Sequence, residues 1–326
     1  NLAATYHCQG RWTESENLFV QVLEQRKRIL GMEHPDTILT AANLATTYHS
    51  QGRWNESEKL LLDVLEQRRR ILGVEHPDTI FAAAEMASIY CSQGRSQGRW
   101  GEAEMLEREA LERRRRIVGV EHPDTIRSAA CLASTYRNQG RLAEAEKLEQ
   151  EVLERRRRIL GVEHPDTIAA VASLAWTYWS QGRWAESEKL EAEVLEQRRR
   201  ILGFEHPDTI NAAANLASTY HSQWRWADSE TLDVEVLEQR KRILGVEHPD
   251  TILAAANLAA TYNAQRRWVT HSKQGRWAEA EKLEVEVLEQ RKRILGIKHP
   301  HTISAAANLA DTYDSQGRLD EAAALL

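Results

Sequence analysis

The sequence contains 326 residues, with 43 Lys and Arg against 49 Asp and Glu, which gives a formal net charge of −6. This balance offers no basic surface for nucleic acid, and no apolar run approaches the ~18 residues that a membrane span requires. The three cysteines, Cys8, Cys91 and Cys131, show no metal-ligand spacing. We therefore expect reduced thiols, a cytoplasmic location, and neither a metal nor a cofactor.

One phrase, His-Pro-Asp-Thr-Ile, recurs along the whole chain. Its prolines, which with the altered copy at residue 300 are all the prolines present, are spaced by 42 residues except for two intervals of 46 and 51. A fixed period of this size indicates tandem repeats, and a repeat array forms one elongated domain at any length. We therefore expect a single array over residues 1–326, with about six full repeats flanked by partial ones, excised from a longer protein.

Each repeat is predicted to fold as two helices, A and B, joined by a hinge. Helix A opens at the proline, whose missing N–H is not needed at the first helical position, and Asp36 in the first turn favours the positive helix end. The histidine before the proline is expected to cap helix A. Helix A runs to about Tyr48, and helix B runs from near Trp54 to just before Gly73, where glycine supplies a left-handed cap.

Helix B has one apolar face and one charged face. Leu60, Val64 and Leu65 follow the 3.6-residue period of the apolar face. The opposite face carries Glu and Arg, and arginine runs such as residues 113–116 recur with glutamates three or four residues upstream. We interpret this face as exposed and internally paired, rather than as a nucleic-acid or localisation patch. The tryptophans that begin helix B are expected to pack between helices; they are Trp12, Trp54, Trp100, Trp184, Trp226 and Trp277.

Two repeats carry insertions in the hinge. Residues 93–100 copy part of the hinge and add four residues, and residues 265–277 contain a nine-residue copy of the same kind. Both insertions lie between helix A and helix B, so neighbouring repeats can still stack. The extra residues either lengthen helices or loop out at one edge, and the sequence leaves both alternatives open.

The repeat unit, Asn-Leu-Ala-x-x-Tyr-x-x-Gln-Gly-Arg-Trp-x-Glu-Ser-Glu, resembles the 42-residue tetratricopeptide repeats of kinesin light chains. It is still more similar to the kinesin-light-chain-like arrays of fungal and bacterial NTPase receptors. Ala45, Tyr48, Ser57 and Val64 fall at the signature spacings, and the resemblance covers essentially the whole chain. It implies a right-handed α-solenoid superhelix in which the A helices line an inner groove that binds peptides, protein surfaces or partner helices.

The sequence departs from this family pattern in two slots. The hinge glycine is replaced by Trp224 and Arg266, and keeping a left-handed turn there would cost about 1 kcal/mol. The slot in the middle of helix B is apolar at Phe19 and Leu61. In later repeats the same slot is acidic, at Glu149, Glu191, Asp233 and Glu284.

Near-identical repeats allow each position of helix A to be compared along the chain. The columns of Ile38, Ala42, Leu44, Ala45 and Tyr48 barely change, whereas four others vary, at spacings of 0, 4, 7 and 10 residues. These four columns share one helix face, here called the variable stripe. Because core positions must repeat when each unit packs on a near copy of itself, the stripe indicates a recognition face, with neutral drift as the alternative. Its candidate ligand-binding residues are Asn43, His49, Phe81, Glu85, Arg127, Arg137, Trp176, Trp179, Asn211, Asn215, His221, Asn257, Asn308, Asp311 and Asp314.

Trp176 and Trp179 are the strongest predicted anchors, next to Arg127 and Arg137 of the preceding unit. Tryptophan and arginine dominate binding hot spots because they bury large areas and offer oriented donors, although one tryptophan could instead serve packing. The stripe asparagines can hold a ligand backbone through an amide donor and acceptor, a role that the resemblance also implies. The last unit carries two aspartates, so a basic ligand segment would fit there.

The leading functional hypothesis is a protein–protein interaction scaffold or ligand-sensing domain, with a protein or peptide as partner and neither nucleic acid nor membrane. Structural self-assembly is the second hypothesis, because apolar faces at terminal half-repeats could stack head to tail. The sequence contains no Gly-rich phosphate loop, zinc spacing or nucleophile elbow, so we do not expect an enzyme.

Overall fold

The computed structural model describes residues 2–268 and 275–325. These residues form sixteen helices and no strand, which confirms the prediction of an all-α chain of helix–turn–helix units. Among the described helices, none combines the length and the apolar character needed to cross a membrane.

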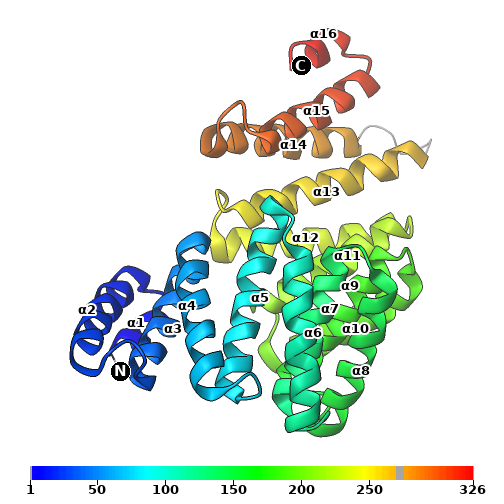
Figure 1. The fold of residues 1–326 in the computed structure, drawn as a ribbon. Coiled ribbons are helices and arrows are strands. Elements are labelled where there is room, and N and C mark those ends of the chain that lie inside the picture. Colours follow the sequence, from blue (N-terminus) through cyan, green and yellow to red (C-terminus); the bar gives the residue numbers. More distant parts are fainter. Residues whose placement is uncertain (1, 269–274, 326) are drawn as a thin grey trace. The chain divides into compact units, whose positions relative to one another are not determined.

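The chain divides into two compact units, Asn1–Ala170 and Val171–Leu326. From α1 to α8, and again from α10 to α16, each helix packs against the next one in the sequence (Figure 1). The expectation of one array over residues 1–326 stays a prediction. The helices are α1 (Leu2–Cys8), α2 (Trp12–Leu30), α3 (Pro35–Ser50), α4 (Trp54–Leu72), α5 (Pro77–Gln97), α6 (Trp100–Ile117), α7 (Pro123–Asn138), α8 (Leu142–Leu160), α9 (Pro165–Ser180), α10 (Trp184–Leu202), α11 (Pro207–Ser222), α12 (Trp226–Leu244), α13 (Pro249–Trp268), α14 (Gly275–Leu295), α15 (Pro300–Ser315) and α16 (Leu319–Ala323).

Each helix A begins with the expected cap. In α3, Pro35 occupies the first helical position and Nδ1 of His34 accepts a hydrogen bond from the Asp36 backbone N–H at 3.2 Å. This bond satisfies one of the amide groups that a helix start leaves without an intrahelical partner. The predicted capping role is confirmed in all seven repeats, at His34, His76, His122, His164, His206, His248 and His299.

Most of the core consists of columns that do not vary between repeats, although the slot of Leu61 is acidic in later ones. Leu44 and Ala45 of α3 are almost fully buried, and they pack with Leu61 and Val64 of α4. Ser57 is also buried, and its hydroxyl donates to the backbone carbonyl of Ala45 at 2.7 Å. The small alanine and the bonded serine let helices A and B approach closely without an unsatisfied polar group.

In several of the described hinges, an arginine joins one repeat to the one before it. The guanidinium of Arg53 lies over the Tyr48 ring, 4.3 Å from its centroid. Its Nη1 donates to Glu16 of the preceding helix B at 2.7 Å, and its Nε donates to Glu56 at 2.6 Å. The same cation–π contact recurs at Arg11, Arg99, Arg141, Arg183, Arg225 and Arg318.

The prediction of a wholly exposed charged face on helix B is wrong for one arginine column. Arg68, Arg114 and Arg240 are buried. Nη1 of Arg68 donates to the Asp78 carbonyl at 2.8 Å. This hydrogen bond joins helix B to the start of the next helix A and offsets part of the cost of burying the guanidinium. Exposed ion pairs do occur elsewhere on this face, as between Arg70 and Glu33.

The tryptophans at the start of helix B pack only in part as predicted. Trp12 and Trp184 are exposed, whereas Trp54, Trp100 and Trp226 are half-buried. Each lies at the open rim of a hinge, where a helix that is just beginning can cover only one side of the indole. The side chain of Trp277 lies outside the described residues.

The first hinge insertion lengthens helix A. Helix α5 has 21 residues where α3 has 16, and the turn that follows is made by Gly98 with φ +70°. Helix α13 likewise extends to Trp268 and includes Arg266, so no left-handed turn forms there. Residues 269–274 of the second insertion lie outside the described residues.

Candidate functional site

The variable stripe in the first unit mixes open side chains with engaged ones. Asn43, Phe81 and Arg127 are exposed. The half-buried residues have partners within the protein: His49 Nε2 lies 2.9 Å from the Ser92 hydroxyl, and Glu85 accepts from the Thr46 hydroxyl at 3.1 Å. Part of the stripe therefore stabilises the contacts between neighbouring A helices.

In the second unit the stripe presents aromatic and amide side chains to solvent. Trp176 and Trp179 on α9 are 45 % and 38 % exposed. Both indoles therefore keep more than a third of their surface open to solvent. Asn211, Asn215, Asn308, Asp311 and Asp314 are also exposed, whereas His221 and Asn257 are half-buried.

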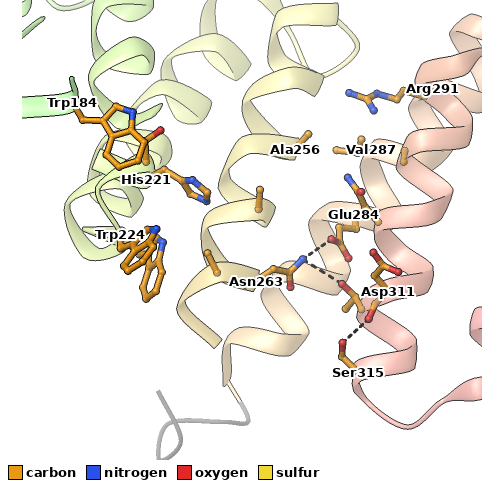
Figure 2. A pocket seen from close by; sticks show the side chains of 17 residues that line it. Trp184, His221, Trp224, Ala256, Asn263, Glu284, Val287, Arg291, Asp311 and Ser315 are labelled. Carbon is orange, nitrogen blue, oxygen red and sulfur yellow. Dashed lines mark hydrogen bonds between the residues drawn. The ribbon is translucent and has the colours of Figure 1, made fainter. Parts of the chain in front are cut away.

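A pocket of about 590 Å³ opens in the second unit (Figure 2). Residues from α10 to α15 line it, and three of the candidate residues, His221, Asn308 and Asp311, meet there. The other candidates of this unit, including Trp176 and Trp179, lie outside it. The stripe thus supplies part of the lining of a concave pocket, the kind of surface on which ligands typically bind.

One wall of the pocket is aromatic. Trp184, Trp224 and Trp226 line it, and Figure 2 shows Trp184, His221 and Trp224 on the same side of the cavity. Trp224 occupies the hinge slot that glycine fills in most repeats, and with φ +64° it is the one non-glycine residue described with a positive φ. This conformation is unfavourable for any residue with a Cβ, so Trp224 destabilises the hinge locally. Its indole is 67 % exposed and lines the pocket.

The opposite wall is polar. Nδ2 of Asn263 donates to Oε1 of Glu284 at 2.8 Å and lies 3.3 Å from the Thr312 hydroxyl, as Figure 2 shows. Asp311 also faces the cavity, and its carbonyl accepts from the Ser315 hydroxyl at 2.7 Å. Among the described residues, no group of three or more His, Cys, Asp or Glu side chains is arranged to hold a metal ion.

Glu284 belongs to a row of buried carboxyl groups in the middle of helix B. The row also includes Glu107, which occupies the same slot of helix B, seven residues after Trp100, and which the sequence analysis left out. Burial raises the pKa of Glu107 and of Glu191 to about 7. The buried members are Glu107, Glu149, Glu191, Asp233 and Glu284.

The last column of the variable stripe reaches over this row. Nη1 of Arg137 donates to Oε1 of Glu149 at 2.9 Å, and the Cys91 thiol lies 3.8 Å from Oε1 of Glu107. Asn263 makes the equivalent contact with Glu284. Variation in this column is therefore coupled to the chemistry of the carboxyl beneath it, which a comparison of helix A alone does not reveal.

The sequence analysis singled out Trp224 only as a departure from the hinge pattern. We expect Trp224→Gly to raise the free energy of unfolding by about 1 kcal/mol, because glycine adopts φ +64° without steric cost. Chemical denaturation followed by circular dichroism measures the change. The converse variant Gly182→Trp, at a hinge with φ +75°, should lower stability by a similar amount; equal stabilities for Trp224→Gly and the parent would contradict this account.

Comparison with family models identifies the repeats. One tetratricopeptide repeat model matches residues 1–61, 37–97, 126–200 and 269–326, and a second tetratricopeptide repeat model matches residues 95–124 and 209–250. A search of curated protein sequences gave no significant match. The matched segments together span well over half of the chain.

Solved structures share this architecture. Nearly identical TPR-like repeats of a kinesin light chain from Podosopora anserina are 26 % identical, with 65 % of this chain and 98 % of that chain covered and a TM-score of 0.58. The apo quorum sensor NprR from B. thuringiensis is 14 % identical, with coverages of 99 % and 84 % and a TM-score of 0.66. A signal transduction ATPase with a tetratricopeptide repeat sensor from Pyrococcus horikoshii is 15 % identical, with coverages of 97 % and 45 % and a TM-score of 0.65. The last two likenesses show the fold alone.

Proposed function

The chain belongs to the tetratricopeptide repeat family, and from this premise we propose that it is a protein–protein interaction scaffold or ligand-sensing domain. Its ligand is a peptide or an extended protein segment, held against the A helices along the variable stripe. Within a larger receptor, the array would be the part that detects the ligand. We propose no catalytic role for it.

One observation carries this proposal: residues that vary between repeats converge on a pocket in the second unit. His221, Asn308 and Asp311 come from two A helices that are separated by a complete repeat in the sequence, yet all three line the same cavity. Exposed tryptophans adjoin it, and large aromatic side chains supply most of the binding free energy at typical interfaces. Asparagine amides beside them can pair with a ligand backbone.

The structural relatives support a sensing role. NprR is described as a quorum sensor, and the Pyrococcus horikoshii protein contains a tetratricopeptide repeat sensor. The cytoplasm is the proposed location, because Cys8, Cys91 and Cys131 are free thiols, which a reducing compartment maintains.

Selection from a displayed library of random dodecapeptides tests the proposed function. We expect the recovered peptides to bind the intact chain and to lose at least tenfold in affinity when Trp176→Ala and Trp179→Ala are combined, because both indoles are open on the stripe. Trp12→Ala is the matched control, since Trp12 is 41 % exposed but lies at a hinge outside the stripe.

Circular dichroism should show unchanged helicity for the double variant and for the Trp12→Ala control. Light scattering at the assay concentrations separates peptide binding from self-association. Failure to recover any peptide, or equal binding by the double variant and the parent, would refute groove recognition.

A further inference from the structure

Acidic and aromatic residues line the pocket in the second unit, and they indicate which kind of ligand group it can bind. Building on the proposed peptide-binding function, we propose that this pocket receives a lysine or arginine side chain of the ligand. The cationic head lies against Glu284 and Asp311, and the stem runs along Trp184 and Trp224. The pocket is therefore a subsite for basic peptides.

The protein contains an internal example of this interaction. In α7 and α8, Arg137 extends from the last stripe column and donates to Glu149 at 2.9 Å. Asn263 and Glu284 occupy the equivalent positions in α13 and α14, and they are also hydrogen-bonded. Asparagine is shorter than arginine by several bonds, so its side chain leaves space in front of the carboxyl group. Asn263 and Glu284 both line the pocket, which lies beside them.

The charges that face the pocket favour a cation. Glu284 and Asp311 contribute two carboxyl groups. Arg291 is the one arginine or lysine among the described lining residues, and its Nη1 donates to the His301 carbonyl at 3.0 Å, which holds this guanidinium at the helix start. Because Glu284 is only 6 % exposed, a cation beside it would be poorly screened by water.

The aromatic wall suits the rest of a basic side chain. A guanidinium or ammonium group is attracted to the face of an indole within about 6 Å, and the methylene stem of lysine or arginine packs on apolar surface. Alanines at positions 256, 260, 264 and 305 line the same cavity and leave room for a long, unbranched side chain. The amide of Asn308 is placed to pair with the peptide backbone.

Small probes separate the contribution of charge from that of shape. N-acetyl-arginine amide and N-acetyl-lysine amide are titrated into the intact chain, and N-acetyl-citrulline amide serves as the neutral analogue of arginine. The readout is the NMR signal of the Trp184 and Trp224 indole N–H groups. We expect saturable shifts with the two cations and at least tenfold weaker binding of citrulline, because charge-assisted hydrogen bonds are about twice as strong as neutral ones.

Three substitutions locate the site. Asn263→Arg should abolish the shifts, because the protein then supplies its own guanidinium to Glu284 as Arg137 does to Glu149. Asp311→Asn should weaken binding of the cations about threefold to tenfold, and its exposed position leaves folding intact. Asp320→Asn is the matched control, since Asp320 is exposed, lies outside the variable stripe and does not line the pocket, and it should change nothing.

Equal binding of citrulline and arginine amides would overturn the subsite, as would undiminished binding by Asn263→Arg. Peptides recovered from the displayed library distinguish this failure from a failure of the proposed function. If they bind the stripe but their basic residues can be replaced by alanine without loss, the basic subsite is wrong and groove recognition stands. If no peptide binds, the proposed function itself fails.

Discussion

Arg137→Met is expected to lower the free energy of unfolding by about 3 kcal/mol near pH 8, because it removes the arginine from a buried ion pair. Glu149 is buried, and its Oε1 accepts from Nη1 of Arg137 at 2.9 Å. Without the guanidinium, the carboxyl group must stay charged in a poorly solvated position or take up a proton. Equilibrium denaturation in urea, followed by circular dichroism, measures the change.

The first repeats contain the matched control for this experiment. Leu61 fills the slot of Glu149 and is fully packed, while His49 stands in the column of Arg137. The double variant Arg137→His, Glu149→Leu copies that arrangement and should return to within about 1 kcal/mol of the parent, since apolar replacement of a buried pair is often neutral. A loss below about 1 kcal/mol in Arg137→Met would show that Glu149 does not depend on this arginine.

Between pH 5 and pH 8, the protein is expected to lose about 2 kcal/mol of stability through each of Glu107 and Glu191. Burial raises the pKa of both carboxyl groups to about 7 from an ordinary value of 4.5. The folded state therefore binds more protons than the unfolded state between these two values. The stabilisation that each carboxyl group contributes is fully present below pH 4.5 and is lost as the pH rises through about 7.

Variants isolate this contribution from all other titrating groups. One oxygen of Glu107 and one of Glu191 have no hydrogen-bond partner among the described residues, so an uncharged amide should be tolerated at both. Glu107→Gln and Glu191→Gln should each flatten the stability profile between pH 5 and pH 8 by about 2 kcal/mol. Glu56→Gln, at an exposed position, should leave the profile shape unchanged; the same result for Glu191→Gln would contradict the assigned cause.

The helices could be predicted from the sequence because their boundaries rest on local chemistry. Pro35 and His34 fix the start of α3 through a backbone restriction and a cap, and Gly73 follows the end of α4 with φ +85°. Each signal acts within a few residues and recurs in every repeat. The family resemblance added the pairing of helices, which local signals do not contain.

The pocket could be predicted only in part. The variable stripe pointed to His221, Asn308 and Asp311, but Trp184, Trp224 and Glu284 belong to other columns and join them only when the helices pack. The sequence marked Trp224 and Glu284 as departures from the repeat pattern. Whether a departure weakens packing or forms a site depends on neighbours tens of residues away, as Asn263 is for Glu284.

The pocket is lined by helices α10 to α15, so no single repeat contains it. In repeat proteins stability is a sum of individual repeat terms and nearest-neighbour interfaces. An occupant of this pocket would bind only when several consecutive hairpins are folded and stacked, and it would add about 3 kcal/mol to that state at a hundredfold excess over its dissociation constant. The rigidity of this segment would therefore increase with the concentration of the partner, and an attached domain could respond to that change.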